Sequence, residues 1–270
     1  MPIQAGPVII PVKLLLAAYR DGIFPMANAR DDPELFWVEP RRRAILPLDG
    51  FHCSHSLAKT LRRGRFTVTC NTAFASVLAA CAAPRHGGQS DQGGETWIND
   101  GIAASYRALH EAGHAHSIET WQMGAEGTPE LIGGLYGVGF DRVFCGESMF
   151  SQATDASKVA LAWLVAALRQ GGIELLDCQF MTGHLASLGA TEISQARYLK
   201  LLRHAQRPAA PRQVAAGAGV AAGVAAAEGA GDGLALALPE AFSALLVAAK
   251  SAGSSSSPGN FIAQSFTQTS

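Results

Sequence analysis

Glu147 stands in a setting where a carboxylate is chemically unusual. It lies in the stretch Val143–Ser151, VFCGESMFS, among apolar and aromatic side chains. Burying a charge costs free energy unless the charge is paired. Glu147 is therefore either a structural acid with a partner inside the protein, which the spacing alone favours, or an acid that receives a cationic group of a ligand. We expect a short strand over Val143–Cys145 that breaks at Gly146 and places Glu147 just beyond its C-terminal end.

Asp177 and Gln179 form a second candidate pair. They lie two residues apart in Glu174–Phe180, ELLDCQF, a stretch that predicts a strand. Residues i and i+2 of a strand point to the same face of the sheet, so this acid and this amide are neighbours. Such a pair can act on a substrate, or it can brace a turn through a buried hydrogen-bond network. The two residues alone favour the second interpretation.

The segment His110–His114 matches the zinc-peptidase motif H-E-x-x-H. That motif needs both histidines on one continuous helix. Gly113 stands where a C-terminal helix cap is expected, and Ala115–Trp121 alternates like a strand. We therefore expect His114 to lie beyond the helix, and the sequence predicts no zinc site here.

The helix expected from Asp155 to about Gln170 follows the Glu147 stretch and is apolar on two sides. Such a helix is either fully buried, or has core on one side and an apolar pocket on the other. One stripe consists of Leu161, Leu164, Val165 and Leu168, and the other of Val159, Trp163, Ala166 and Ala167.

Size and composition limit the class of protein. The chain has 270 residues, of which 48% are hydrophobic, enough for one large or two small domains. No apolar run reaches the roughly 20 residues that span a bilayer, and the N-terminus lacks a signal-peptide pattern, so we expect a cytoplasmic protein without a membrane segment. Its 5 cysteines lack a Cys-x-x-Cys pair, which suits a reducing compartment and argues against a cysteine-based zinc site.

The net charge of -1 does not indicate a nucleic-acid-binding protein, but local groups of cations do. Lys59, Arg62 and Arg63 fall on one face of the helix expected over His55–Arg65. Together with the run Arg41–Arg43 they form a plausible surface for a nucleic-acid backbone. The alternative for both groups is a solvated edge, which is the commoner fate of such stripes.

The composition changes from about Ala205. Gly217–Gly233 is almost entirely Ala, Gly and Val without a period, which predicts a disordered linker. Pro239–Lys250 predicts at most a marginal helix, and Ser254–Ser257 with the last polar residues predicts a tail.

A set of short motifs occurs in a fixed order over about residues 13–204. The motifs are GIFP (Gly22–Pro25), GETWI (Gly94–Ile98), YRALHEAGHAHSIE (Tyr106–Glu119), GGLYGV (Gly133–Val138), FCGESMFS (Phe144–Ser151), ASK (Ala156–Lys158), DCQ (Asp177–Gln179) and HLASLGA (His184–Ala190). Each motif is weak alone, but the ordered set closely resembles the bacterial leucyl/phenylalanyl-tRNA–protein transferases.

The resemblance implies an α+β fold. A small N-terminal domain, residues 1–45, would pack on a GNAT-like acyltransferase domain with a mixed central sheet, residues 46–204. Residues 205–270 lie outside the resemblance and are expected to form a low-complexity, disordered extension.

The resemblance also implies an activity. Members move Leu or Phe, and Met less well, from aminoacyl-tRNA to the α-amino group of proteins that begin with Arg or Lys, which marks them for degradation by the N-degron route. The donor is already an activated ester, so no metal and no other cofactor is implied. We expect a cytoplasmic monomer whose partners are Leu-tRNA, Phe-tRNA and such proteins.

Roles for single residues follow from the resemblance. Gln179 would accept a hydrogen bond from the attacking amine, and Asp177 would orient it and help to read the acceptor's basic residue. Glu147 would bind the α-ammonium group of the donor. The tRNA backbone would lie on Lys59, Arg62 and Arg63. The residues that bind the aminoacyl end are Met26, Trp97, Leu135, Phe144, Glu147, Leu161, Leu164 and Leu168.

Three of these positions depart from the family pattern. Met26 replaces a tryptophan that helps to hold the terminal adenine, and Leu164 and Leu168 occupy positions that are often phenylalanine. We therefore expect a reshaped pocket and a changed preference between Leu and Phe.

Alternatives remain at this stage. The same fold could use a different acyl donor, although the sequence has no clear loop for the pyrophosphate of acetyl-CoA. The HEAGH segment could belong to a zinc peptidase. A non-catalytic RNA-binding module is a third possibility.

Overall fold

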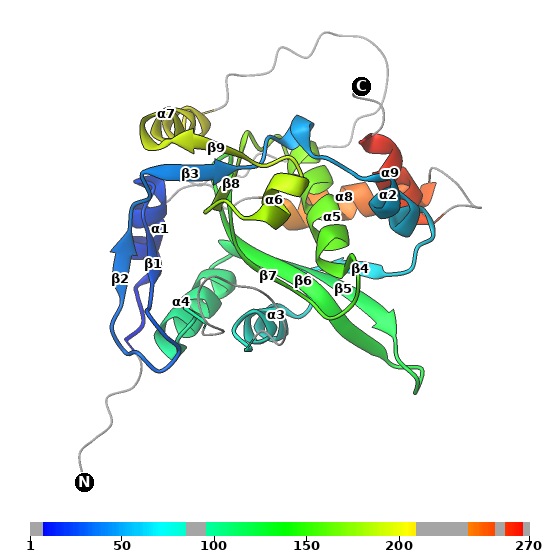
Figure 1. Cartoon of the computed structure of the whole chain (residues 1–270), viewed down its shortest axis with the longest axis horizontal. Helices are drawn as coiled ribbons and strands as arrows, with labels where there is room; N and C mark the ends of the chain where they lie inside the picture. Colours follow the sequence, from blue (N-terminus) through cyan, green and yellow to red (C-terminus); the bar gives the residue numbers. More distant parts are fainter. Residues whose placement is uncertain (1–7, 85–95, 209–236, 252–256, 267–270) are drawn as a thin grey trace.

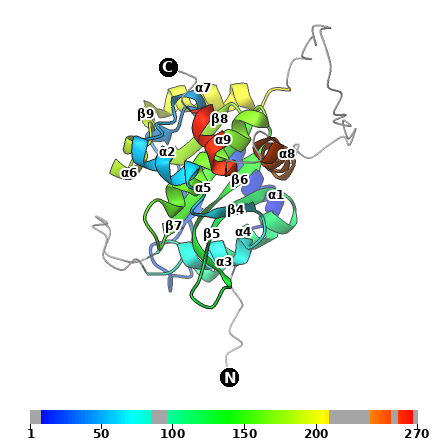
Figure 2. The same cartoon turned by 90° about the vertical axis from the view of Figure 1, so that its right-hand side faces the viewer.

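The computed structural model describes residues 8–84, 96–208, 237–251 and 257–266. Within these ranges the chain forms a two-stranded sheet, a seven-stranded sheet, and helices on both faces of the larger sheet (Figures 1 and 2). The expected α+β class is confirmed. None of the helices in these ranges is long and apolar enough to cross a membrane.

The seven-stranded sheet has the order β4-β5-β6-β7-β8-β3-β9. Neighbouring strands are antiparallel except β7 and β8, which run parallel. This is the mixed central sheet that was expected, and it is consistent with a GNAT-like domain. Its strands are β3 (Arg42–Ile45), β4 (Thr67–Cys70), β5 (Ala115–Met123), β6 (Pro129–Phe140), β7 (Val143–Ser151), β8 (Leu175–Gln179) and β9 (Thr191–Ser194).

The N-terminal elements lie beside one end of this sheet (Figure 1). They are α1 (Val12–Arg20) and the antiparallel pair β1 (Phe24–Met26) and β2 (Phe36–Val38). Gly22, with a φ of 82°, turns the chain after α1 in a conformation that favours glycine. The next strand, β3, already pairs with β8 and β9, so the large sheet takes in residues before the boundary expected at residue 45.

Two apolar cores lie on opposite faces of the large sheet. Helices α3 (Phe74–Cys81) and α4 (Asp100–Glu111) pack on one face together with α1. Helix α5 (Ala156–Gln170) packs on the other. The elements that complete this part of the chain are η1 (Leu48–Gly50), α2 (His55–Arg62), α6 (Gly183–Ser187) and α7 (Gln195–Ala205).

Helices α8 (Leu238–Ser251) and α9 (Pro258–Ser265) pack on α5 and α2. The expectation of a disordered extension beyond Ala205 is therefore wrong for these helices, because each buries an apolar side against the first core. The helix expected at Pro239–Lys250 is confirmed as α8. Its Phe242 packs on Trp163, which explains why α5 is apolar on two sides. The expected linker Gly217–Gly233 lies outside the described residues.

Candidate active site

A β-bulge in β7 directs Glu147 into the protein. Gly137 pairs with Gly146 and Tyr136 pairs with Ser148, so Glu147 has no partner across the sheet. One extra residue of this kind re-aims a side chain. The Glu147 side chain is accordingly buried, at 8% exposure. The expected break of the strand at Gly146 is wrong, because β7 continues through the bulge to its end at Ser151.

Glu147 is held by neutral hydrogen-bond donors. The Tyr106 hydroxyl donates to its Oε2 and the Gln179 amide nitrogen Nε2 donates to its Oε1, each over 2.9 Å. Burial raises the pKa of Glu147 to about 7, against the lowering effect of hydrogen bonds from Gln179, Tyr19 and Tyr106. Among the described residues no cation pairs with this carboxylate. The Glu147 carboxylate therefore has hydrogen-bond partners, but no positively charged side chain in the described residues balances its charge.

Asp177 forms a buried ion pair with Arg43. Arg43 Nη2 lies 2.6 Å from Asp177 Oδ2, and the two side chains are 1% and 0% exposed. Arg43 Nε also donates to Oδ1 over 2.9 Å, and the Tyr198 hydroxyl donates to Oδ2 over 2.9 Å. The charge of Asp177 is thus balanced by Arg43 inside the protein, and its side chain is buried.

The same ion pair corrects both interpretations of the arginine run, a phosphate contact and a solvated edge, for Arg43 alone. Arg43 is neither solvated nor free for phosphate. Arg42 is exposed and pairs with Glu192, and Arg41 is exposed. The three arginines are adjacent in the sequence, but within β3 Arg42 is exposed whereas Arg43 and Ala44 are both buried in the core.

Asp177 and Gln179 are brought together as expected. The Gln179 backbone N–H donates to Asp177 Oδ1 over 2.8 Å. Gln179 has a φ of 61°, which costs a non-glycine residue about 1 kcal/mol or more and persists only where the surroundings enforce it. The hydrogen bond to Asp177 holds Gln179 in this backbone conformation, in which the side-chain amide of Gln179 points toward Glu147.

The apolar residues expected at the aminoacyl end divide between the two cores. Leu135, Phe144, Leu161, Leu164 and Leu168 are all buried in the first core, around α5. Met26 and Trp97 are half-buried and pack against the second core, which contains Tyr19 and Tyr106. Glu147 hydrogen-bonds into this second core, whereas Phe144 of the same strand belongs to the first.

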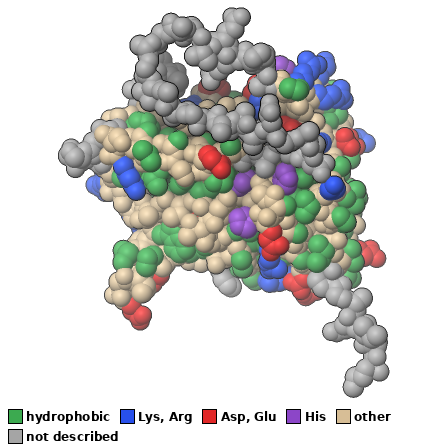
Figure 3. Space-filling model, turned by 180° about the vertical axis from the view of Figure 1, so that it is seen from behind, with side chains coloured by type: hydrophobic (Ala, Val, Ile, Leu, Met, Phe, Trp, Pro, Cys, Tyr) green, Lys and Arg blue, Asp and Glu red, His purple; other side chains and the backbone are tan. Residues whose placement is uncertain are grey.

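Lys59, Arg62 and Arg63 are exposed at α2 and its C-terminal end. None of them has an ion-pair partner among the described residues. Cations are not confined to α2, however. Figure 3 shows Lys and Arg side chains gathered at the corner where α7 lies, a helix that carries the exposed residues Arg197, Lys200 and Arg203. The distribution of exposed cations alone therefore does not identify α2 as the surface that binds tRNA.

Comparison with known proteins decides the family. The profile of the leucyl/phenylalanyl-tRNA protein transferase matches residues 45–203, and that of the N-terminal domain of the same proteins matches residues 10–41. The chain belongs to this family. The resemblance drawn from the ordered motifs is thereby confirmed, and the protein is a transferase enzyme.

Curated relatives support the same assignment. The leucyl/phenylalanyl-tRNA–protein transferase of Novosphingobium aromaticivorans is 62% identical over 98% of this chain and 98% of its own length. That of Rhizorhabdus wittichii is 56% identical over 70% of this chain and 72% of its own length. That of Ruegeria pomeroyi is 53% identical over 74% of this chain and 89% of its own length. The first of these alignments extends over the C-terminal helices α8 and α9.

The HEAGH segment of this transferase is not arranged as in a zinc peptidase. Helix α4 ends at Glu111, and Gly113 has a φ of 80°, so His114 lies beyond the helix as expected. His110 Nδ1 contacts the Ala115 carbonyl oxygen over 2.8 Å. The described residues contain no cluster of three or more His, Cys, Asp or Glu side chains that could hold a metal ion.

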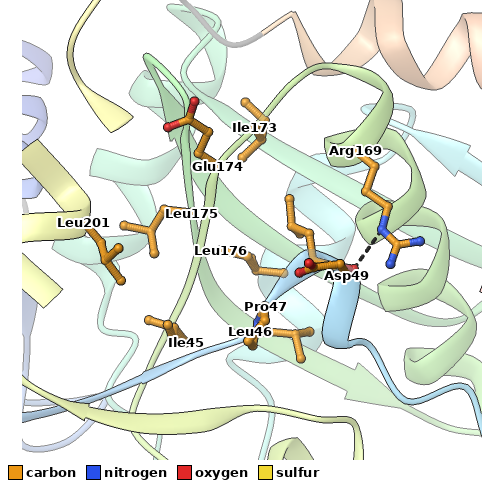
Figure 4. Close-up of a pocket in the computed structure, with 11 residues that line it drawn as sticks. Ile45, Leu46, Pro47, Asp49, Arg169, Ile173, Glu174, Leu175, Leu176 and Leu201 are labelled. Carbon is orange, nitrogen blue, oxygen red and sulfur yellow. Dashed lines mark hydrogen bonds between the residues drawn. The ribbon is translucent and has the colours of Figure 1, made fainter. Parts of the chain in front are cut away.

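A cavity of about 410 Å³ lies away from Glu147, between β3, β8 and the end of α5 (Figure 4). None of the site residues expected from the sequence lines it. Two of its charged side chains already have partners: Arg169 Nε donates to the Leu48 carbonyl oxygen over 2.7 Å, and Glu174 pairs with Arg142. We assign it no part in the transferase site.

Sequence reasoning missed the tyrosines around Glu147. Tyr106 was named only as the first residue of a motif, and Tyr19 was not singled out. The hydroxyls of Tyr19 and Tyr106 lie 2.5 Å apart, and the Tyr106 hydroxyl also donates a hydrogen bond to Glu147. The Tyr136 hydroxyl is buried without a partner among the described residues. A signal was present, because a buried tyrosine normally needs a partner for its hydroxyl.

Proposed function

We propose that this transferase moves leucine or phenylalanine, and methionine less well, from aminoacyl-tRNA to the α-amino group of proteins that begin with Arg or Lys. The product would carry a new N-terminal residue and enter the N-degron route of degradation. Its tRNA donors place the proposed reaction in the cytoplasm, and we expect the protein to act as a monomer.

The observation that carries this proposal is the state of Glu147. It is a buried carboxylate with neutral donors on both oxygens and, within the described part of the chain, no cation paired with it. The α-ammonium group of an aminoacyl ester supplies the missing charge. A cation beside the acid would lower its pKa from about 7, so donor binding would fix it in the ionised form.

Gln179 is the proposed contact for the attacking amine. Its Nε2 donates to Glu147, which leaves its Oε1 as an acceptor. An α-amine has a pKa of about 8, so roughly a tenth is neutral at pH 7. The amide is a poor base, and its proposed role is to orient this neutral amine toward the ester carbonyl carbon. The amine nitrogen forms the new peptide bond, the ester C–O bond breaks, and the amine loses a proton as the tRNA hydroxyl gains one.

Asp177 is proposed as a positioning residue. It accepts the backbone N–H of Gln179 and is itself held by Arg43 and Tyr198. These contacts support a role in keeping Gln179 in its left-handed conformation, with its amide directed at Glu147.

The first core is proposed to receive the donor side chain through Leu135, Phe144 and the α5 stripe Leu161, Leu164 and Leu168. A pocket of this kind discriminates by shape, and each methylene contributes only about 1–3 kcal/mol. Some transfer of methionine is therefore expected, whereas Ile and Val would be rejected through clashes of their β-branches. Met26 and Trp97 are proposed to pack on the terminal adenosine, and the α2 cations to contact the tRNA backbone.

The test is transfer of labelled leucine from Leu-tRNA to a peptide that begins with Arg, with an Ala-initial peptide as the matched control. Transfer to the Arg peptide alone, unchanged by EDTA, supports the proposal. Asp177→Ala and Gln179→Ala should lower turnover by 10²-fold or so, the usual size of a positioning effect, and leave the affinity for aminoacyl-tRNA near normal.

Two results would contradict it. Unchanged turnover in both variants would remove Asp177 and Gln179 from the mechanism. No transfer from either Leu-tRNA or Phe-tRNA would mean that the fold uses another donor, and Met26, Leu164 and Leu168 would be the first positions to exchange.

A further inference from the structure

Helix α2 is too short to be stable alone. It has 8 residues, and isolated helices of this length are marginal in water. Its inner side buries Leu57, Ala58 and Leu61, and its outer side carries the cations proposed to contact RNA. The position of those cations therefore depends on what holds the helix from within.

The C-terminal end of α2 is held by the start of α9. The Ser257 hydroxyl donates to the carbonyl oxygen of Arg62 over 2.8 Å and contacts that of Leu61 over 3.3 Å. Carbonyls in the last turn of a helix lack intrahelical partners, so this side chain supplies one. Gly259 lies so close that a methyl group there would overlap the Leu61 carbonyl oxygen. Figures 1 and 2 both show α9 beside α2.

The other side of α9 is anchored in the first core. The Phe266 ring lies 4.8 Å from that of Phe51, and Arg169, on α5, donates to the Ser265 carbonyl oxygen over 3.3 Å. Helix α8 packs along α5 through the rings of Phe242 and Trp163, 5.5 Å apart. The helix pair thus connects α5, which carries the proposed side-chain pocket, to α2, which carries the proposed RNA contacts.

We propose that α8 and α9 hold the cationic end of α2 in the position that receives the phosphate backbone of the donor tRNA, with Ser257 and Gly259 as positioning residues. This inference rests on the proposed role of Lys59, Arg62 and Arg63. Contacts between cations and phosphates supply much of the affinity for a nucleic acid, and they require the charge to be correctly placed.

The experiment uses the full chain with Ser257→Ala and Gly259→Ala. Ser251→Ala is the matched control, since among the described residues the Ser251 hydroxyl bonds only to Val247 within α8. The double variant Lys59→Ala/Arg62→Ala tests the RNA surface itself, and Lys200→Ala on α7 removes an exposed cation elsewhere. For each variant the Kd for uncharged tRNA is measured over a range of salt, together with KM and kcat for Leu-tRNA and the Tm.

Ser257→Ala should raise the tRNA Kd and the KM about three- to tenfold, the range for losing one or two hydrogen bonds, while kcat changes less than about twofold. Gly259→Ala should do the same more strongly. Ser251→Ala and Lys200→Ala should have neither effect. In the Lys59→Ala/Arg62→Ala background Ser257→Ala should have a smaller effect, because Arg63 is the one charge left of the three that it positions.

A fall in Tm with unchanged tRNA affinity in both Ser257→Ala and Gly259→Ala would overturn the inference and leave α9 as a purely stabilising element. If Lys59→Ala/Arg62→Ala itself binds tRNA normally, the proposed RNA surface is wrong and the inference falls with it. The two failures are therefore distinguishable.

Discussion

Gln179 Nε2 donates a hydrogen bond to Glu147 Oε1 over 2.9 Å, which joins the end of β8 to the bulge in β7. Each residue occupies an irregular backbone position: Glu147 is unpaired in the sheet, and Gln179 has a left-handed φ. Irregular positions of this kind persist where surrounding contacts enforce them, and they gather at functional sites. The predictions below test what each enforcing contact does.

Replacing Glu147 by glutamine keeps the shape and removes the charge. The affinity for Leu-tRNA should fall by on the order of tenfold or more, because a buried charge-assisted contact is lost. The affinity for uncharged tRNA, which has no α-ammonium group, should not change. Equal loss for both ligands would show that Glu147 acts on the fold and not on the donor.

The raised pKa of Glu147 predicts a pH dependence of stability. Burial raises this pKa from 4.5 to about 7, so the folded state binds the proton more tightly than the unfolded state. Stability should therefore fall as pH rises from about 4.5 to about 7, by at most a few kcal/mol from this group. Glu147→Gln should remove that part of the slope. Urea unfolding of both proteins between pH 5 and pH 8, compared as a difference, measures it.

Arg43→Met should leave Asp177 buried and unpaired. Breaking a buried pair in this way typically costs about 3–5 kcal/mol. The neighbouring Arg42→Met is the matched control, since its pair with Glu192 is exposed and should contribute less than about 1 kcal/mol. Chemical denaturation of both variants tests the contrast, and equal costs would contradict the assignment of Asp177 as a residue held by Arg43.

Gly137→Ala should disrupt the bulge. A methyl group at Gly137 would overlap the carbonyl oxygen of Cys145 and the ring of Phe144, so β7 must shift beside Glu147. We expect a loss of about 1–3 kcal/mol in stability, as for overpacking in a core, and a fall in transfer activity. Gly183→Ala, where a methyl group meets open space, is the control. Full activity in Gly137→Ala would mean that the bulge does not set the position of Glu147.

Periodicity was sufficient to predict much of the fold. The strand with Asp177 and Gln179 and the helix after Asp155 were expected within a residue or two of β8 and α5. Gly113 correctly marked the end of α4. These features depend on local side-chain patterns, which a sequence displays directly.

Contacts between distant parts of the chain could not be predicted in this way. Arg43 and Asp177 are 134 residues apart, and nothing local indicates that an arginine in a basic run lies in the core. Considered alone, the apolar stripe of α8 predicts only a marginal helix. Its partner is the α5 stripe around Trp163, and periodicity within each helix does not show that the two stripes pack together. The bulge at Glu147 depends on the register of β6, which alternation does not fix.

The contact of α9 with α2 has a consequence for synthesis of the chain. Ser257 and the carbonyl of Leu61 are separated by 196 positions, so the ribosome must add all of these residues before α2 meets its support. At the usual rate of about 5–20 residues per second, α2 waits roughly ten seconds or longer for α9 to emerge. A message that ends before α9 would yield a chain with the Glu147 site complete and the cationic helix unsupported.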